Sequence, residues 1–186
     1  MTTLSELFSE IGHTDKHTTH SYDKFYGPLF QARASTVKNF LEIGVAEFGG
    51  GCLKAFCTLF PEAQVHGLDI KNIPRHNRSE MLELPENGHF HLGDGYSEDF
   101  INKTFGDTKW DIVLDDGPHT KESQAACLNL YHNRLAENGM IIIEDVNPIA
   151  VDYVLNNFEG DGNRLSVVDR RACPHSNFDE ILIIYM

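Results

Sequence analysis

The sequence has little positive charge, no long apolar run and few cysteines, and each shortage argues against a class of protein. Lysine and arginine number 15 against 28 aspartates and glutamates, which gives a net charge of −13. A basic footprint for nucleic-acid phosphates or an anionic membrane surface is missing, so we expect neither partner. No apolar run approaches the ~20 residues of a membrane span. The four cysteines lack zinc-site spacing, which indicates reduced thiols.

What is present favours one cytoplasmic domain with an ordinary core. The stretch "MTTLSELFSEIGHTDK" has neither the basic start nor the apolar centre of a secretory signal. A chain of 186 residues, 41% hydrophobic and 23% charged, can bury a substantial core. We expect residues 1–30 to form an N-terminal segment of helix and loop, and residues 31–186 to form the main domain.

Apolar runs of strand length alternate with helical patterns along most of the chain. Strands are predicted at 39–44, 64–70, 89–93, 110–115, 140–145, 164–169 and 180–186, and helices at 3–11, before Pro61 and at about 121–135. Such alternation is typical of a parallel sheet covered by helices on both faces. The connection between the last two strands has no helical pattern and is too short for a crossover, so the last strand should be antiparallel. We therefore predict an α/β, Rossmann-like, doubly wound sheet of seven strands.

Glycines and acids stand at the ends of the first three strands, where such sheets bind ligands. Gly44 and the triplet 49–51 would allow close backbone approach to a ligand, although a simple strand-to-helix turn is the alternative. Asp69 could accept both hydroxyls of a ribose, and Asp94 could reach an adenine amino group. Glu42 would be an expensive buried charge unless a ligand's ammonium group offset it. The missing G-x-G-x-x-G pattern counts against a nicotinamide dehydrogenase.

A second group of acids follows the fourth and fifth strands, in "DDGPHT" and "MIIIEDV". Neighbouring strand ends would bring Asp116, Glu144 and Asp145 together, with His119 beside them. Three carboxylates suit a hard ion such as Mg²⁺. A divalent cation would lower the pKa of an acceptor hydroxyl, so that His119 could remove its proton. The alternative is that these acids only cap the following helices, a task that Thr120 could perform.

These segments, read in order, resemble a known enzyme group over nearly the whole chain. "EIG", Asp69, "GDGYS" and "DDGPH" look like a class I S-adenosylmethionine-dependent methyltransferase. "DDG-x-H" with "EDV" resembles the metal-dependent O-methyltransferases of macrolide sugars, of mycinamicin and macrocin type, and the cephalosporin-hydroxylase-like family. The resemblance implies S-adenosylmethionine as cofactor, Gly95 and Tyr96 as further cofactor contacts, and Asp115 facing the methyl group. It also implies the acids matching Asp116, Glu144 and Asp145 as Mg²⁺ ligands and the histidine matching His119 as the base.

The N-terminal "GHTDKHTTHSYDKFY" resembles the segment that precedes the methyltransferase core in this group. By that analogy Lys16 pairs with the cofactor's carboxylate, and His20, Tyr22 and Tyr26 form a lid over the site. Two other interpretations are a metal cluster of the histidines at 13, 17 and 20, and ordinary loop histidines.

The sequence thus predicts a metal-dependent O-methyltransferase that acts on a sugar or glycan hydroxyl. A catechol-type O-methyltransferase acting on a small molecule and a non-catalytic module that binds S-adenosylmethionine are the alternatives. The chain carries no added substrate domain, so we expect an open acceptor site that suits a large glycan or is completed by a second subunit in a homo-oligomer.

Overall fold

The computed structural model describes residues 2–45, 49–71, 83–173 and 180–186, and in this part of the chain a seven-stranded sheet has the order β3-β2-β1-β4-β5-β7-β6. The strands are β1 (Asn39–Ile43), β2 (Gln64–Asp69), β3 (Gly88–Leu92), β4 (Trp110–Asp115), β5 (Leu135–Ile143), β6 (Leu165–Asp169) and β7 (Ile181–Tyr185). Strands β1 to β5 pair in parallel, and β7 runs antiparallel to both β5 and β6. The predicted α/β sheet with an antiparallel last strand is confirmed.

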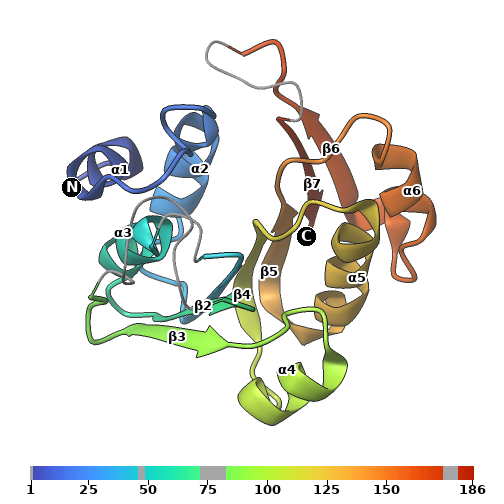
Figure 1. Ribbon diagram of the computed structural model, residues 1–186, viewed down its shortest axis with the longest axis horizontal. Coiled ribbons are helices and arrows are strands. Elements are labelled where there is room, and N and C mark those ends of the chain that lie inside the picture. The colour runs from blue at the N-terminus through green and yellow to red at the C-terminus, as the bar shows by residue number, and fades with distance from the viewer. Residues whose placement is uncertain (1, 46–48, 72–82, 174–179) are drawn as a thin grey trace.

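Helices lie on both sides of this sheet, with α1 to α3 on one side and α4 to α6 on the other (Figure 1). They are α1 (Leu4–Ile11), α2 (Tyr22–Gln31), α3 (Gly51–Leu59), α4 (Glu98–Phe105), α5 (Lys121–Tyr131) and α6 (Val151–Asn156), with short 3-10 turns η1 (His132–Arg134) and η2 (Gly162–Arg164). No helix among the described residues has both the length and the apolar character needed to cross a membrane. Parts of two predicted loops, residues 46–48 and 174–179, lie outside the described residues.

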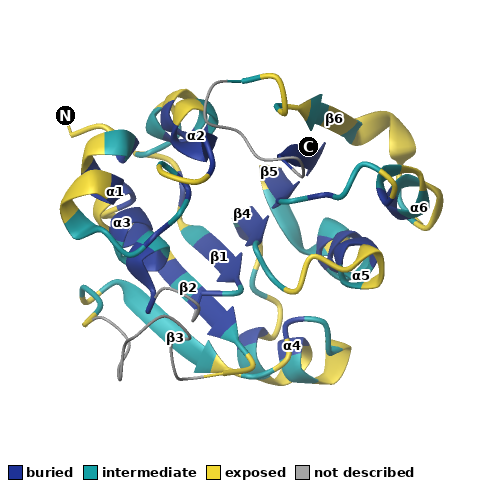
Figure 2. Ribbon diagram, turned by 45° about the horizontal axis from the view of Figure 1, so that its top comes forward, coloured by how far each residue is buried: buried dark blue, intermediate teal, exposed yellow. Residues whose placement is uncertain are grey.

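The central strand β4 is buried on both faces because its side chains alternate between two cores. Ile112 and Leu114 pack in the core that α1, α2 and α3 cover, while Val113 packs in the core under α4, α5 and α6. Figure 2 shows buried residues along β1, β4 and β5, between the two helical layers. Phe8 of α1 and Phe30 of α2 belong to the first core. The N-terminal segment is therefore packed against the sheet, close to its strand ends.

Helix α5 is shorter than the sequence pattern predicts. It ends at Tyr131, and β5 begins at Leu135, where a continued helix or loop was expected. Leu135 pairs with Trp110, and the register then shifts before Ile112. The pairing with β4 overrides the apolar spacing that resembled another helical turn, as tertiary contacts commonly override a local preference.

Candidate functional site

Two cavities open at the carboxyl ends of the parallel strands, and both are lined by Gly44 and Asp116. The first has a volume of about 350 Å³. It is lined by Ile43, Gly44, Leu68, Asp69, Ile70, Lys71, Gly93, Asp94, Gly95, Tyr96, Asp116, Gly117 and Pro118. The predicted cofactor residues of the first three strand ends thus come together with the loop after β4. Its volume is in the range of small-molecule sites.

The second cavity, of about 230 Å³, is mainly polar. It is lined by His13, Thr14, Asp15, Glu42, Gly44, Val45, Gly51, Cys52, Asp116, His119 and Asp145. Because Asp116 lines both cavities, a ligand in the first would end beside the acids of the second. This arrangement suits a reaction between two bound molecules.

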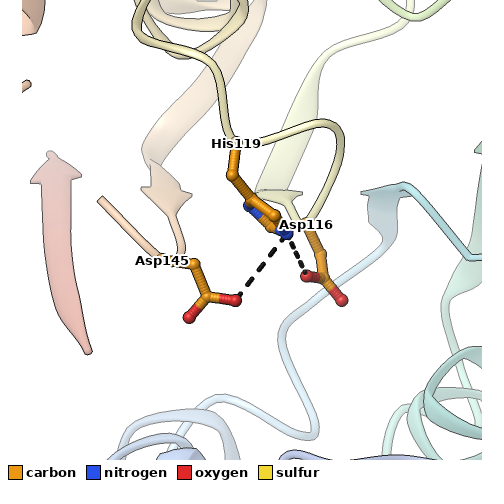
Figure 3. Close-up of side chains that lie close together, drawn as sticks. All are labelled: Asp116, His119 and Asp145. Carbon is orange, nitrogen blue, oxygen red and sulfur yellow. Dashed lines mark ion pairs between the residues drawn. The ribbon is translucent and has the colours of Figure 1, made fainter. Parts of the chain in front are cut away.

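Asp116, His119 and Asp145 converge from two loops on one point of the second cavity (Figure 3). His119 Nε2 lies 3.6 Å from Asp116 Oδ1 and 3.7 Å from Asp145 Oδ2. Among the described residues these three are the one group of histidine, cysteine or acidic side chains whose ligand atoms are close enough to share a metal ion. The histidines at 13, 17 and 20 do not form such a group, so the alternative of a histidine metal cluster is wrong.

Glu144 points to the same region but is engaged by other side chains. Lys16 Nζ donates to Glu144 Oε2, and Tyr26 Oη donates to Glu144 Oε1. Lys16 also donates to Asp116 Oδ2 at 2.6 Å. Burial alone would lower the pKa of Lys16, but the carboxylates of Asp116 and Glu144 raise it above its ordinary value, so the ammonium stays charged. Both oxygens of Glu144 thus have a protein donor.

Tyr22 and His20 border Asp145, the third acid of the predicted set. Tyr22 Oη donates to Asp145 Oδ1, which leaves Asp145 Oδ2 facing His119. His20 Nδ1 lies 3.6 Å from Asp145 Oδ1, and its ring stacks on Tyr22 with 5.0 Å between centroids. Both side chains are buried beside Asp145. Glu180, which directly precedes β7, accepts from both the backbone N and Oγ of Ser21, which holds this segment in place.

Glu42 is buried in β1 and borders the second cavity. It is 1% exposed, and beyond the Cys52 thiol neither carboxylate oxygen has a hydrogen-bond partner among the described residues. Burial raises its pKa to about 8, even though the Lys16 ammonium opposes that shift. A cationic ligand group at this place, which the sequence predicts, would offset the cost of a buried carboxylate.

Asp115, the last residue of β4, is also buried. Tyr96 Oη donates to Asp115 Oδ1, and burial raises the pKa of Asp115 to about 6 despite this bond. Tyr96 also lines the first cavity, and the Tyr96 backbone N donates to Asp94 Oδ1 at 2.9 Å. Tyr96 therefore connects the loop after β3 with the end of β4.

Local backbone geometry turns the two acid loops toward each other. His119 and Asp145 have positive φ angles of 53° and 50°, which polar residues adopt at functional turns more readily than branched ones. Thr120 caps α5 by accepting from Ser123 N at 3.1 Å, so the acids are not needed as caps. Gln124 Nε2 donates to Glu144 O at 3.0 Å and fixes the second loop.

Sequence reasoning missed two contributions. Lys16 pairs with Asp116 and Glu144, contacts that the analogy with the cofactor's carboxylate did not predict. The signal in the sequence for this pairing was the excess of acids at adjoining strand ends, because clustered buried carboxylates need a nearby cation. Gln124 was not singled out, and only its position one turn after the capping Thr120 could have indicated it.

Comparison with known proteins gives related results for sequence and fold. Residues 41–146, more than half of the chain, match the family model described as a methyltransferase domain. The mycinamicin VI 2''-O-methyltransferase of Micromonospora griseorubida is 29% identical over 77% of this chain and 36% of its own length. The 8-demethyl-8-alpha-L-rhamnosyl tetracenomycin-C 2'-O-methyltransferase of Streptomyces olivaceus is 30% identical over 70% of this chain and 33% of its own length. The chain thus spans about a third of these curated relatives.

Among solved structures, the MycE methyltransferase from the mycinamycin biosynthetic pathway, in complex with Mg, SAH and mycinamycin VI, has a similar fold. The TM-score is 0.72 at 21% identity, over 99% of this chain and 53% of that one. The structure named cmcI-D160 Mg-SAM gives a TM-score of 0.60 at 19% identity, over 93% of this chain and 74% of that one. At these identities the likeness shows a shared fold.

Proposed function

Because the chain belongs to the family of methyltransferase domains whose model matches residues 41–146, we propose that it is an S-adenosylmethionine-dependent O-methyltransferase. Its acceptor is a hydroxyl of a sugar or glycan, and a divalent cation such as Mg²⁺ is its second cofactor. One observation carries the proposal: Asp116 lines both the cavity of the predicted cofactor residues and the cavity where His119 and Asp145 converge.

The first cavity fits the nucleoside part of the cofactor. Leu68 and Ile70 offer apolar surface for a flat base, and Asp94 can accept a hydrogen bond from an amino group on that base. Asp69, at the end of β2, is suited to the ribose hydroxyls. In the adjoining cavity, the buried carboxyl group of Glu42, which has no protein cation bonded to it among the described residues, suits the cofactor's ammonium group.

The acid set fits a divalent cation. Asp116 Oδ1 and Asp145 Oδ2 face the second cavity, and carboxylate oxygens are the ligands that Mg²⁺ prefers. Glu144 would complete the predicted set only if it shared an oxygen with Lys16 or Tyr26. A bound cation would supply positive charge that makes a neighbouring alcohol more acidic.

His119 is then the proton acceptor of the reaction. Its side chain is 36% exposed, so Nε2 is accessible to an acceptor in the second cavity. Nε2 lies 3.6 Å from Asp116 Oδ1 and 3.7 Å from Asp145 Oδ2, which puts the base beside the oxygens that would hold the cation. Gly44 and Gly117 line the first cavity beside Asp116, where their lack of side chains lets the two substrates approach for in-line transfer.

The names of the relatives support the acceptor class. Both relatives are named as O-methyltransferases. The name of the Streptomyces olivaceus protein specifies a rhamnosyl tetracenomycin as the molecule acted on. A sugar hydroxyl is therefore the acceptor to test first.

The test measures release of S-adenosylhomocysteine from S-adenosylmethionine by the full chain, with Mg²⁺ or with chelator, over a panel of glycosides and a catechol. We expect Mg²⁺-dependent turnover of a glycoside, and turnover of the catechol alone would favour the catechol-type alternative. His119→Gln should lower turnover by about 10²- to 10⁴-fold while Mn²⁺ binding stays within a few-fold. Asp116→Asn should lose both turnover and Mn²⁺ binding.

His89→Gln is the matched control, because His89 lies on the edge strand β3, where it bonds Gln64 of β2, away from the acids. It should retain full turnover. Undiminished activity of Asp116→Asn in chelator would refute the metal-assisted mechanism. Binding of S-adenosylhomocysteine without transfer to any acceptor would favour the non-catalytic module.

A further inference from the structure

Lys16 is the most deeply buried cation at the acid site. Its side chain is 2% exposed, and Nζ lies between Asp116 and Glu144. The surrounding backbone is fixed, since Lys16 N donates to Thr14 Oγ1 at 3.2 Å and Lys16 O accepts from Asp23 N at 3.1 Å. The ammonium is thus held in place by the fold of the N-terminal segment.

The charge balance around Lys16 is strongly negative. Asp116, Glu144 and Asp145 gather at one point, and Asp15 lines the same cavity as two of them. Within the described part of the chain, Lys16 is the one lysine or arginine that pairs with any of the three clustered acids. Buried carboxylates without such a partner would be costly to hold ionised.

Lys16 also selects which carboxylate oxygens remain open. It occupies Asp116 Oδ2 and Glu144 Oε2, while tyrosine hydroxyls occupy Glu144 Oε1 and Asp145 Oδ1. The two oxygens left over are Asp116 Oδ1 and Asp145 Oδ2, and both face His119.

We propose that Lys16 is a resident counter-ion of the acid site. Its ammonium reduces the negative charge of the site to the amount that one divalent cation neutralises, and it leaves the open oxygens of Asp116 and Asp145 facing His119. This proposal rests on the proposed function. With all three carboxylates ionised, the site carries three negative charges, and the ammonium leaves two, which one divalent cation would neutralise. Lys16 is a positioning residue in this role, because it acts through Asp116 and Glu144 and not on the acceptor.

The test measures Mn²⁺ binding by electron paramagnetic resonance and S-adenosylhomocysteine binding by calorimetry, without any acceptor. Lys16→Met should bind Mn²⁺ at least about tenfold more tightly than the wild type, because a nearby repelling charge is removed from a partly buried site. Its thermal midpoint should fall in chelator and recover with Mg²⁺. Binding of S-adenosylhomocysteine should change by less than about threefold, because the altered charge affects mainly the metal. Lys16→Arg should restore the wild-type Mn²⁺ affinity, because the charge is kept.

Lys24→Met is the matched control, since Lys24 is an exposed lysine on α2 that pairs with Asp23. It should leave both binding constants unchanged. Weaker Mn²⁺ binding by Lys16→Met would overturn the proposal. A large loss of S-adenosylhomocysteine affinity with unchanged Mn²⁺ binding would also overturn it, and would favour the role of Lys16 as partner of the cofactor's carboxylate. If Lys16→Met does not fold, the double variant Lys16→Met/Glu144→Gln, which removes both partners, should fold. Failure of both variants would show that Lys16 serves packing and would also overturn the proposal.

These measurements are independent of methyl transfer. A chain that transfers no methyl group to any acceptor would refute the proposed function but leave the predicted Mn²⁺ response of Lys16→Met intact. Absence of Mn²⁺ binding in both wild type and Lys16→Met would refute the counter-ion role itself.

Discussion

Gly44 follows β1 and lies against the backbone of Asp116, so replacing it with alanine should damage the fold and the site together. Its φ angle is +92°, a conformation that side chains rarely adopt. A Cβ at this position would lie 1.9 Å from the carbonyl oxygen of Asp116 and 2.8 Å from Cα of Gly117. Both obstacles are backbone, so no side-chain rotation can relieve the overlap.

The magnitude follows from two separate costs. The positive φ costs about 1–3 kcal/mol for a residue with a Cβ. Relieving the overlap adds about 1–3 kcal/mol, as for overpacking in a core. We therefore expect Gly44→Ala to lower the free energy of unfolding by about 2–6 kcal/mol. The carbonyl of Asp116 must also retreat by roughly 1.5 Å to reach ordinary contact distance, which should weaken Mn²⁺ binding severely because metal ligands tolerate little displacement.

Two other glycines separate the costs in urea unfolding experiments. Gly106 has φ +53°, and a Cβ added there would meet nothing within 4 Å, so Gly106→Ala should show the conformational cost alone. Gly27 lies in α2 with open space and no positive φ, so Gly27→Ala should be neutral or stabilise by up to about 1 kcal/mol. A loss for Gly44→Ala no greater than that for Gly106→Ala would refute the argument from backbone overlap.

Three further outcomes are expected. Burial raises the pKa of Glu42 to about 8 from 4.5, so between these pH values the folded state keeps a proton that the unfolded chain releases. The free energy of unfolding should therefore fall as pH rises from 4.5 to 8, by up to about 5 kcal/mol. Glu42→Gln should flatten that decline in urea unfolding measured from pH 5 to 8, and an unchanged slope would contradict it. Tyr96→Phe should cost about 1–3 kcal/mol and raise the pKa of Asp115 above about 6, as seen by NMR titration, because a buried carboxylate loses its donor. Mg²⁺ at about 100 times its dissociation constant should stabilise the wild type by about 2.7 kcal/mol, and Asp145→Asn should abolish this gain in thermal unfolding.

The sequence by itself determined the sheet and the place of the site. Near-continuous apolar runs such as "MIIIE" require burial on both faces, and a short connection without a helical pattern requires the antiparallel β7. Acids directly after such strands must gather at one edge, because parallel strands end on the same side. Asp69, Asp94 and Asp116 accordingly line one cavity. The local sequence pattern predicted the wrong start for β5, because that start depends on the pairing of Leu135 with Trp110 of another strand.

Only the tertiary structure decided which atoms of the acids are available. Lys16 is separated from Asp116 by 100 positions and from Glu144 by 128, and nothing in its neighbours along the chain distinguishes a buried lysine from an exposed one. Its place follows from how α1 and α2 pack on α3 and the sheet. Sequence periodicity records which face of an element is apolar, but the partner of a polar side chain depends on how distant elements meet. The choice of open oxygens beside His119 is therefore a property of the fold.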